Sequence, residues 1–169
     1  LRDRVAGSQN VALHNLTASD IARFIELTTA RAPAASLVTA IFQKTAGNPF
    51  FTEEVVQNLI ETRKLQGEKG AYRLVAPIDK LEVPSTVHAL LAARIDRLAE
   101  REKDVLQTAA VIGREFDEPT LAAVVGIEAS LLREALQKLK GTEFIREQSL
   151  YPVAEYLFKH PLTQEVALT

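Results

Sequence analysis

The chain has 169 residues, of which 47% are hydrophobic and 25% are charged, and its formal net charge is −2. These values are typical of a globular protein of one or two small domains, and they lack the concentrated positive charge of a nucleic-acid-binding surface. Cysteine is absent, which excludes disulfide bonds, thiolate metal sites and cysteine nucleophiles.

The sequence carries no sign of a membrane or secretory segment. No apolar run approaches the roughly 20 residues of a membrane span, and no signal peptide is recognisable. Methionine is absent and the first residue is Leu1. We therefore expect a cytoplasmic protein without a membrane partner, and a segment cut from a longer chain.

The first elements have the spacing of a small helical bundle. Residues 11–16 are typical of a short strand or an extended entry segment. Thr17 and Asp20 form a capping-box pattern, which predicts that a helix begins there. A second helix is expected over residues 34–46 and a third over residues 49–64, each with an apolar stripe at helical spacing.

The turn between the second and third helices carries the sequence Gly47-Asn48-Pro49. Glycine tolerates the left-handed conformation that often ends a helix. The Asn48 side chain can accept a hydrogen bond from a free N–H group of the next helix, and Pro49 occupies a position where a missing N–H costs nothing. The local chemistry predicts a tight helix–turn–helix corner.

A linker is expected in the middle of the chain. A short strand is predicted over residues 72–75, and the segment that follows is bounded by Pro77 and Pro84. We therefore divide the chain into a helical segment at 1–75, a linker at 76–84 and a second domain at 85–169.

The second domain has helical segments followed by two strand-like runs and a last helix. This order is that of a winged-helix domain. The predicted fold class is therefore mainly α, with a small helical bundle followed by a winged-helix domain that contains a β-hairpin. Helices are expected from Ser85 or Thr86, over 101–112, after Asp117, over 129–140 and from Pro161, and strands over 142–148 and 153–158.

The corner also resembles a known family. The run Gly47-Asn48-Pro49-Phe50-Phe51-Thr52-Glu53-Glu54 resembles the motif that follows the nucleotide-binding core in STAND-type signalling ATPases. It is most similar to the ATPase regions that bacteria fuse to class III adenylate cyclases and to LuxR-type regulators. Four later segments resemble the same family in the same order: Val83-Pro84-Ser85-Thr86-Val87, the 93–98 segment, the 109–116 segment and the 158–166 segment around His160.

The resemblance implies a fold and a set of site residues. In that family a helical lid and a winged-helix domain follow the core and close over bound nucleotide. Pro49 would then lie near the adenine base, together with Gly47 and Asn48, and His160 would reach the diphosphate. The resemblance implies ATP or ADP as the cofactor of the full-length parent, and the nucleotide-binding core of that parent as the partner of this segment.

The residues that would carry out chemistry are missing from the sequence. It contains no Gly-x-x-x-x-Gly-Lys-Ser/Thr phosphate loop. It also contains no apolar strand that ends in paired acids, and no recognisable metal-binding or purine-binding residues of a cyclase. We therefore expect no catalytic residues, no metal site and no nucleotide bound by this segment alone.

Plainer interpretations of the same residues stay open. Gly47, Asn48 and Pro49 are also explained by helix capping, and His160 by an N-cap role before Pro161. Arg94, Asp96 and Arg97 are expected to form solvated pairs on a helix surface or to contact the absent core.

The leading functional hypothesis is a non-catalytic regulatory segment of a bacterial adenylate or guanylate cyclase-type protein. One alternative is the same segment of a LuxR-type transcription activator, and another is a freestanding winged-helix DNA-binding protein. Direct DNA binding is not expected, because residues 129–140 have only a mild positive bias and the 148–152 turn has no basic residue. Self-association through exposed apolar surface is expected when the core is absent.

Overall fold

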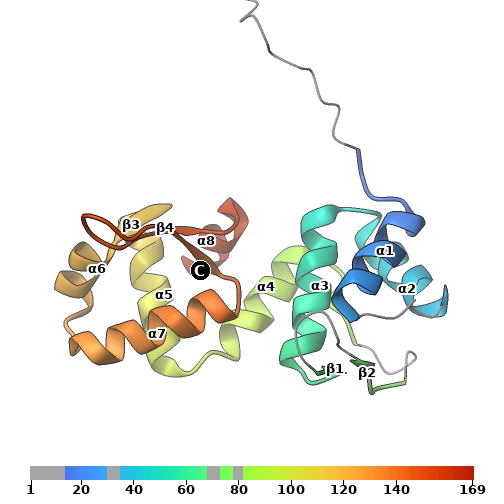
Figure 1. Cartoon of the computed structure of the whole chain (residues 1–169), viewed down its shortest axis with the longest axis horizontal. Helices are drawn as coiled ribbons and strands as arrows, with labels where there is room; N and C mark the ends of the chain where they lie inside the picture. Colours follow the sequence, from blue (N-terminus) through green and yellow to red (C-terminus); the bar gives the residue numbers. More distant parts are fainter. Residues whose placement is uncertain (1–13, 30–34, 68–72, 78–81) are drawn as a thin grey trace, which may run out of the picture.

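The computed structural model of the chain describes residues 14–29, 35–67, 73–77 and 82–169. The described part is mainly helical, and it includes a three-stranded antiparallel sheet and a small two-stranded one (Figure 1). Of the segment predicted as a short strand or an extended entry, residues 11–13 lie outside the described residues and residues 14–16 do not form a strand. The helices are α1 (Ala18–Thr29), α2 (Ala35–Thr45), α3 (Pro49–Glu61), α4 (Val87–Asp96), α5 (Glu100–Ile112), α6 (Glu118–Val125), α7 (Ala129–Gly141) and α8 (Pro161–Ala167). The strands are β1 (Leu65–Gln66), β2 (Arg73–Leu74), β3 (Glu115–Asp117), β4 (Ile145–Ser149) and β5 (Glu155–Phe158).

The first three helices share an apolar core, called here the N-terminal core. The capping box predicts the start of α1 correctly, because the Thr17 N–H donates to Asp20 at 2.9 Å and the Asp20 N–H donates to Thr17 Oγ1 at 3.2 Å. Each helix then turns its apolar stripe inward, which removes that stripe from water. The buried residues of the N-terminal core are Ile21, Ile25, Leu37, Val38, Ile41, Phe51, Val55, Val56, Leu59, Leu65 and Leu90.

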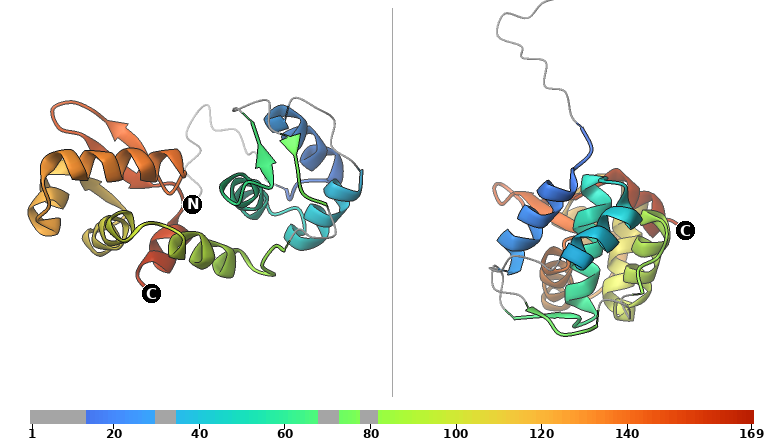
Figure 2. Two further views of the ribbon diagram at one scale, coloured as in Figure 1. Left: turned by 90° about the horizontal axis from the view of Figure 1, so that it is seen from below. Right: turned by 90° about the vertical axis from the view of Figure 1, so that its right-hand side faces the viewer.

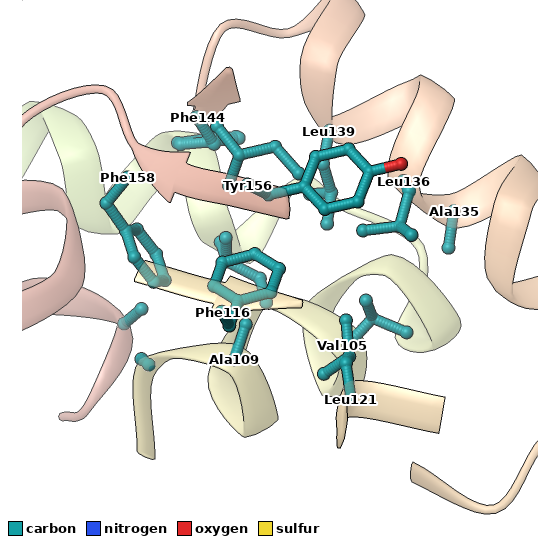
Figure 3. Packing of buried hydrophobic residues seen from close by; sticks show 14 of the residues in the cluster. Val105, Ala109, Phe116, Leu121, Ala135, Leu136, Leu139, Phe144, Tyr156 and Phe158 are labelled. Carbon is teal, nitrogen blue, oxygen red and sulfur yellow. The ribbon is translucent and has the colours of Figure 1, made fainter. Parts of the chain in front are cut away.

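The last four helices and the three-stranded sheet surround a larger C-terminal core (Figure 3). Phe116 of β3 packs against Tyr156 and Phe158 of β5, with ring centroids 5.8 and 5.9 Å apart. Leu136 and Leu139 of α7 cover this aromatic group. Aromatic side chains bury large areas, so these rings fix how the sheet lies on the helices.

The three-stranded sheet has the order β3-β5-β4, and both pairings are antiparallel. The β4–β5 hairpin follows the two strand-like runs that the sequence indicates. Strand β3 was not predicted, because three residues are too few to show an alternating pattern. It forms because Phe116 must enter the core, where it pairs with Tyr156.

Helix α4 lies between the two cores (Figures 1 and 2). Its neighbouring residues Leu90 and Leu91 are both fully buried, but Leu90 belongs to the N-terminal core and Leu91 to the C-terminal core. The helix packs against α3 on one side and α8 on the other. Because α4 has an apolar residue for each core, it couples the two halves of the described structure. Within the described residues, no helix combines the length and the apolar character that crossing a membrane requires.

Candidate functional site

The corner before α3 has the geometry that its sequence predicts. Asn48 is the N-cap residue, and its Oδ1 accepts a hydrogen bond from the Phe51 N–H at 2.9 Å. Pro49 is the first residue of the helix. Gly47 has a φ of 76° and its carbonyl accepts a hydrogen bond from the Leu16 N–H at 2.6 Å. All three residues therefore have a structural role that needs no ligand.

Glycine is required at position 47 for a second reason. A Cβ atom added there would lie 2.1 Å from the carbonyl oxygen of Leu16. That oxygen belongs to the backbone and cannot move away as the end of a side chain can. The left-handed conformation and the close approach therefore both select glycine.

His160 is the N-cap residue of α8, as the plainer interpretation holds. Its Nδ1 accepts a hydrogen bond from the Leu162 N–H at 3.1 Å. A neutral imidazole carries one proton, so this bond leaves the proton on Nε2. Burial lowers the pKa of His160 from its ordinary value, and the nearby positive charge of Arg114 lowers it further. His160 is therefore a neutral side chain with an Nε2–H group that can donate.

The corner and the His160 turn meet in space. The rings of Phe50 and His160 are stacked, with centroids 3.8 Å apart and planes inclined by 10°. Phe50 is in the first turn of α3, yet it packs against the C-terminal core. Lys159 adds an ionic contact, because its Nζ lies 3.4 Å from Glu53 and also pairs with Glu143. Two segments separated by more than a hundred positions in the sequence thus form one site.

A buried arginine joins the same two halves at a second point. The prediction of a solvated Arg94 is wrong, because its side chain is completely buried. Its guanidinium pairs with Glu54 and Glu61 of α3, and the Nε–Oε2 distance to Glu61 is 3.0 Å. Nη2 donates to the Thr142 carbonyl at 2.6 Å, and the guanidinium carbon lies 4.5 Å from the centre of the Phe144 ring.

The ionic state of this group follows from its partners. Burial by itself lowers the pKa of Arg94, but the hydrogen bonds and charges of Glu61 and Glu54 outweigh it and raise that pKa. Burial raises the pKa of Glu54, and the positive charge of Arg94 opposes this rise. Since an arginine stays protonated in proteins, the two carboxylates face a permanent cation. A bidentate arginine of this kind positions α3, α4 and the C-terminal end of α7 relative to one another.

The sequence contains a signal that points to Arg94. Leu90 and Leu91 lie four and three positions before it, which places Arg94 on the buried stripe of the helix. An arginine on such a stripe needs acidic partners from another element. The other two residues of the predicted surface set behave as expected: Asp96 is exposed and pairs with Lys103, and Arg97 is only partly covered.

The exposed face of α7, the candidate DNA-reading helix, is electrically mixed. Arg133 pairs with Glu118, and Glu134 on the same face pairs with Arg101. Lys140 pairs with Glu147 of β4. A shallow hollow of about 740 Å³ lies along this face. The surface therefore presents paired charges rather than a row of cations for a phosphate backbone.

Among the residues that the structure describes, no group of three or more His, Asp or Glu side chains is arranged to hold a metal ion. Comparison with models of protein families, with curated proteins and with solved structures finds no match for this chain. The site is therefore interpreted from its own chemistry: a neutral histidine donor stacked on an aromatic ring, beside a helix-capping corner.

Proposed function

We propose that this chain is a non-catalytic regulatory arm of a bacterial multidomain signalling ATPase. In this proposal the part up to residue 75 is the helical lid, and the part from residue 85 is the winged-helix domain. The parent is an adenylate or guanylate cyclase-type protein of the cytoplasm. The arm closes over ATP or ADP bound to the nucleotide-binding core, which lies outside this chain.

One observation carries the proposal. The sequence resemblance assigns nucleotide-facing roles to Pro49 and His160, which are far apart in the chain. The stacking of Phe50 on His160 brings the residue after Pro49 into contact with His160 itself. Pro49 and His160 therefore lie close enough to each other to face the same nucleotide, as the resemblance requires.

The chemistry of His160 supports a role at a phosphate. Because Nδ1 is occupied by the cap of α8, the remaining Nε2–H is a donor. Such a donor fits a phosphate oxygen, and the ring face is held by Phe50. The residues of this chain thus fit a nucleotide only in part, since a phosphate also needs a cradle of backbone N–H groups. The bound nucleotide would supply the negative charge that closes the arm on the core.

A nucleotide switch also requires different affinities for two arrangements of the protein. The group around Arg94 fixes lid and winged helix to each other through charged hydrogen bonds. In this proposal the two parts therefore act on the core together, and the bound nucleotide biases that contact.

The test is calorimetric titration of ADP and ATP into the chain extended upstream through its expected phosphate loop. We expect Pro49→Ala and His160→Ala each to weaken binding by about tenfold, the effect of losing roughly 1.4 kcal/mol. Pro77→Ala and His88→Ala are the matched controls, because both positions are exposed. The controls should bind as the unmodified chain does.

The outcome decides between two interpretations. If the extended chain binds nucleotide and neither Pro49→Ala nor His160→Ala weakens it, these residues are structural and the proposal fails. The alternative parent, a LuxR-type activator, would have the same site. Only the domains that flank this segment in the full-length protein would distinguish it from a cyclase-type parent.

A further inference from the structure

The loop of the β4–β5 hairpin exposes apolar side chains. We call residues 149–154 the hairpin tip. Within it, Leu150 is 69% exposed, Tyr151 is 88% exposed and Val153 is 38% exposed. Isolated exposed apolar residues are common, but three within four positions on a projecting loop form a patch. Tyrosine is enriched among the residues that dominate protein interfaces.

The base of the hairpin tip is acidic. Asp117 of β3 and Glu155 of β5 are direct cross-strand partners. Like charges in that position repel each other. Glu118 follows Asp117 and pairs with Arg133 at 3.4 Å. Asp117 is the N-cap of α6, where its carboxylate accepts hydrogen bonds from the N–H and the hydroxyl group of Thr120, and the described structure gives neither Asp117 nor Glu155 a cationic partner. An approaching cationic surface would relieve this repulsion.

A surface of opposite character lies on the other half of the molecule. Between α2 and α3 is a hollow of about 320 Å³, mostly lined by apolar side chains. A second hollow of about 630 Å³ adjoins it, because Lys44 and Val83 line both. Among the described residues, the charged side chains that line this pair of hollows are Lys44, Lys64, Arg97 and Glu82. Arg97 also pairs with Glu61 at 3.5 Å, so the excess of positive charge along the rim is small. We call the pair the α2–α3 groove.

We propose that the hairpin tip of one copy of this chain docks into the α2–α3 groove of a second copy. The apolar projection fits an apolar hollow, and the acidic base meets the cationic rim. At roughly 30 Å³ per water, the apolar hollow holds on the order of ten water molecules. The side chains of Leu150 and Tyr151 together have a similar number of non-hydrogen atoms, so they can displace that water.

The two surfaces cannot meet within one molecule. The hairpin loop beside α6 is at one end of the long axis, and α2 is at the other end (Figures 1 and 2). A contact between two different surfaces is heterologous, so a pair of joined copies still has one free tip and one free groove. Association therefore continues head to tail, as a ring or as an open chain, rather than stopping at a symmetric dimer. This inference does not rest on nucleotide binding, so it can fail or succeed independently of the proposed function.

The test is sedimentation equilibrium of the 169-residue chain over a wide concentration range. The tip variant is Leu150→Ser with Tyr151→Ser, and the groove variant is Ala40→Glu with Lys44→Glu. We expect the unmodified chain to grow beyond a dimer with concentration. Each variant alone should raise the apparent dissociation constant at least tenfold. A second run at high salt should weaken association of the unmodified chain, since the rim contacts are ionic.

Mixing the two variants gives the decisive result. The tip variant has an unmodified groove, and the groove variant has an unmodified tip. In an equimolar mixture the tip of one groove variant can therefore dock into the groove of one tip variant, and no further contact can form. We expect that mixture to form dimers that do not grow further. A control variant, Val111→Ser with Lys138→Glu, changes exposed residues outside both surfaces and should associate as the unmodified chain does.

Three results would overturn the inference. They are an unmodified chain that stays monomeric, a tip or groove variant that associates normally, and an equimolar mixture that stays monomeric although circular dichroism shows both variants folded. The last result would identify a symmetric interface or a different surface.

Discussion

The imidazole ring of His160 lies almost parallel to the phenyl ring of Phe50, with centroids 3.8 Å apart. This contact joins the first turn of α3 to the first residue before α8. It makes the capping histidine part of the boundary between the two halves of the structure. The behaviour of His160 should therefore report on that boundary.

The ring contact should give a measurable coupling energy. We expect a double-mutant cycle of Phe50→Leu and His160→Asn, followed by urea unfolding, to give about 0.5–1.5 kcal/mol. Asparagine keeps an acceptor for the α8 cap, so the cycle isolates the ring contact. The same cycle with Phe42→Leu in place of Phe50→Leu should give a coupling near zero.

Protonation of His160 should lower stability. The folded-state pKa of His160 lies below its ordinary value of 6.5, because of burial and Arg114. Between those two pKa values the unfolded chain binds more protons than the folded chain, so stability rises with pH. The contribution of His160 is thus fully present above about pH 6.5 and is lost as the pH falls through the folded-state pKa.

The physical reason is the α8 cap, since a protonated Nδ1 cannot accept from the Leu162 N–H. We expect His160→Asn to flatten the pH dependence of the free energy of unfolding below pH 6.5, by at most about 1.4 kcal/mol per pH unit. An equal slope in the unmodified chain and in His160→Asn would contradict the assignment.

Removal of the buried arginine should destabilise the fold strongly. Arg94→Ala leaves Glu54 and Glu61 without their cation in a covered position, which costs about 3–5 kcal/mol. Arg94→Lys keeps the charge but loses the planar guanidinium, so its free energy of unfolding should lie between those of the unmodified chain and of Arg94→Ala. Arg101→Ala breaks the exposed pair with Glu134 and should cost less than about 1 kcal/mol. Urea unfolding of the three variants measures the difference.

Substitutions at two glycines should distinguish the cost of a left-handed backbone conformation from the cost of a steric clash. Gly47 and Gly126 both have left-handed φ values, 76° and 70°. A Cβ atom would strike the Leu16 carbonyl at position 47 but would meet nothing within 4 Å at position 126. We expect Gly126→Ala to cost about 1–2 kcal/mol and Gly47→Ala to cost clearly more. Similar melting temperatures for the two variants would show that the Leu16 segment moves aside.

The helix-capping hydrogen bonds could be predicted from the sequence. The pair of Thr17 and Asp20, and the Asn48 cap of α3, both form as predicted. These interactions join residues three positions apart, so the spacing alone reveals them. The helical stripes and the β4–β5 hairpin were predictable for the same reason, because their periods are short.

Contacts between residues far apart in the sequence could not be predicted from spacing. Arg94 was predicted to be solvated, although Leu90 and Leu91 place it on the buried stripe, because its acidic partners lie 33 and 40 positions away. Strand β3 was missed because its partner β5 comes much later in the chain. The sequence therefore determined each helix, its caps and its apolar face, since these depend on neighbours within a few residues. Only the tertiary structure decided that Phe50 meets His160 and that Arg94 is buried, because both depend on how two cores pack across α4.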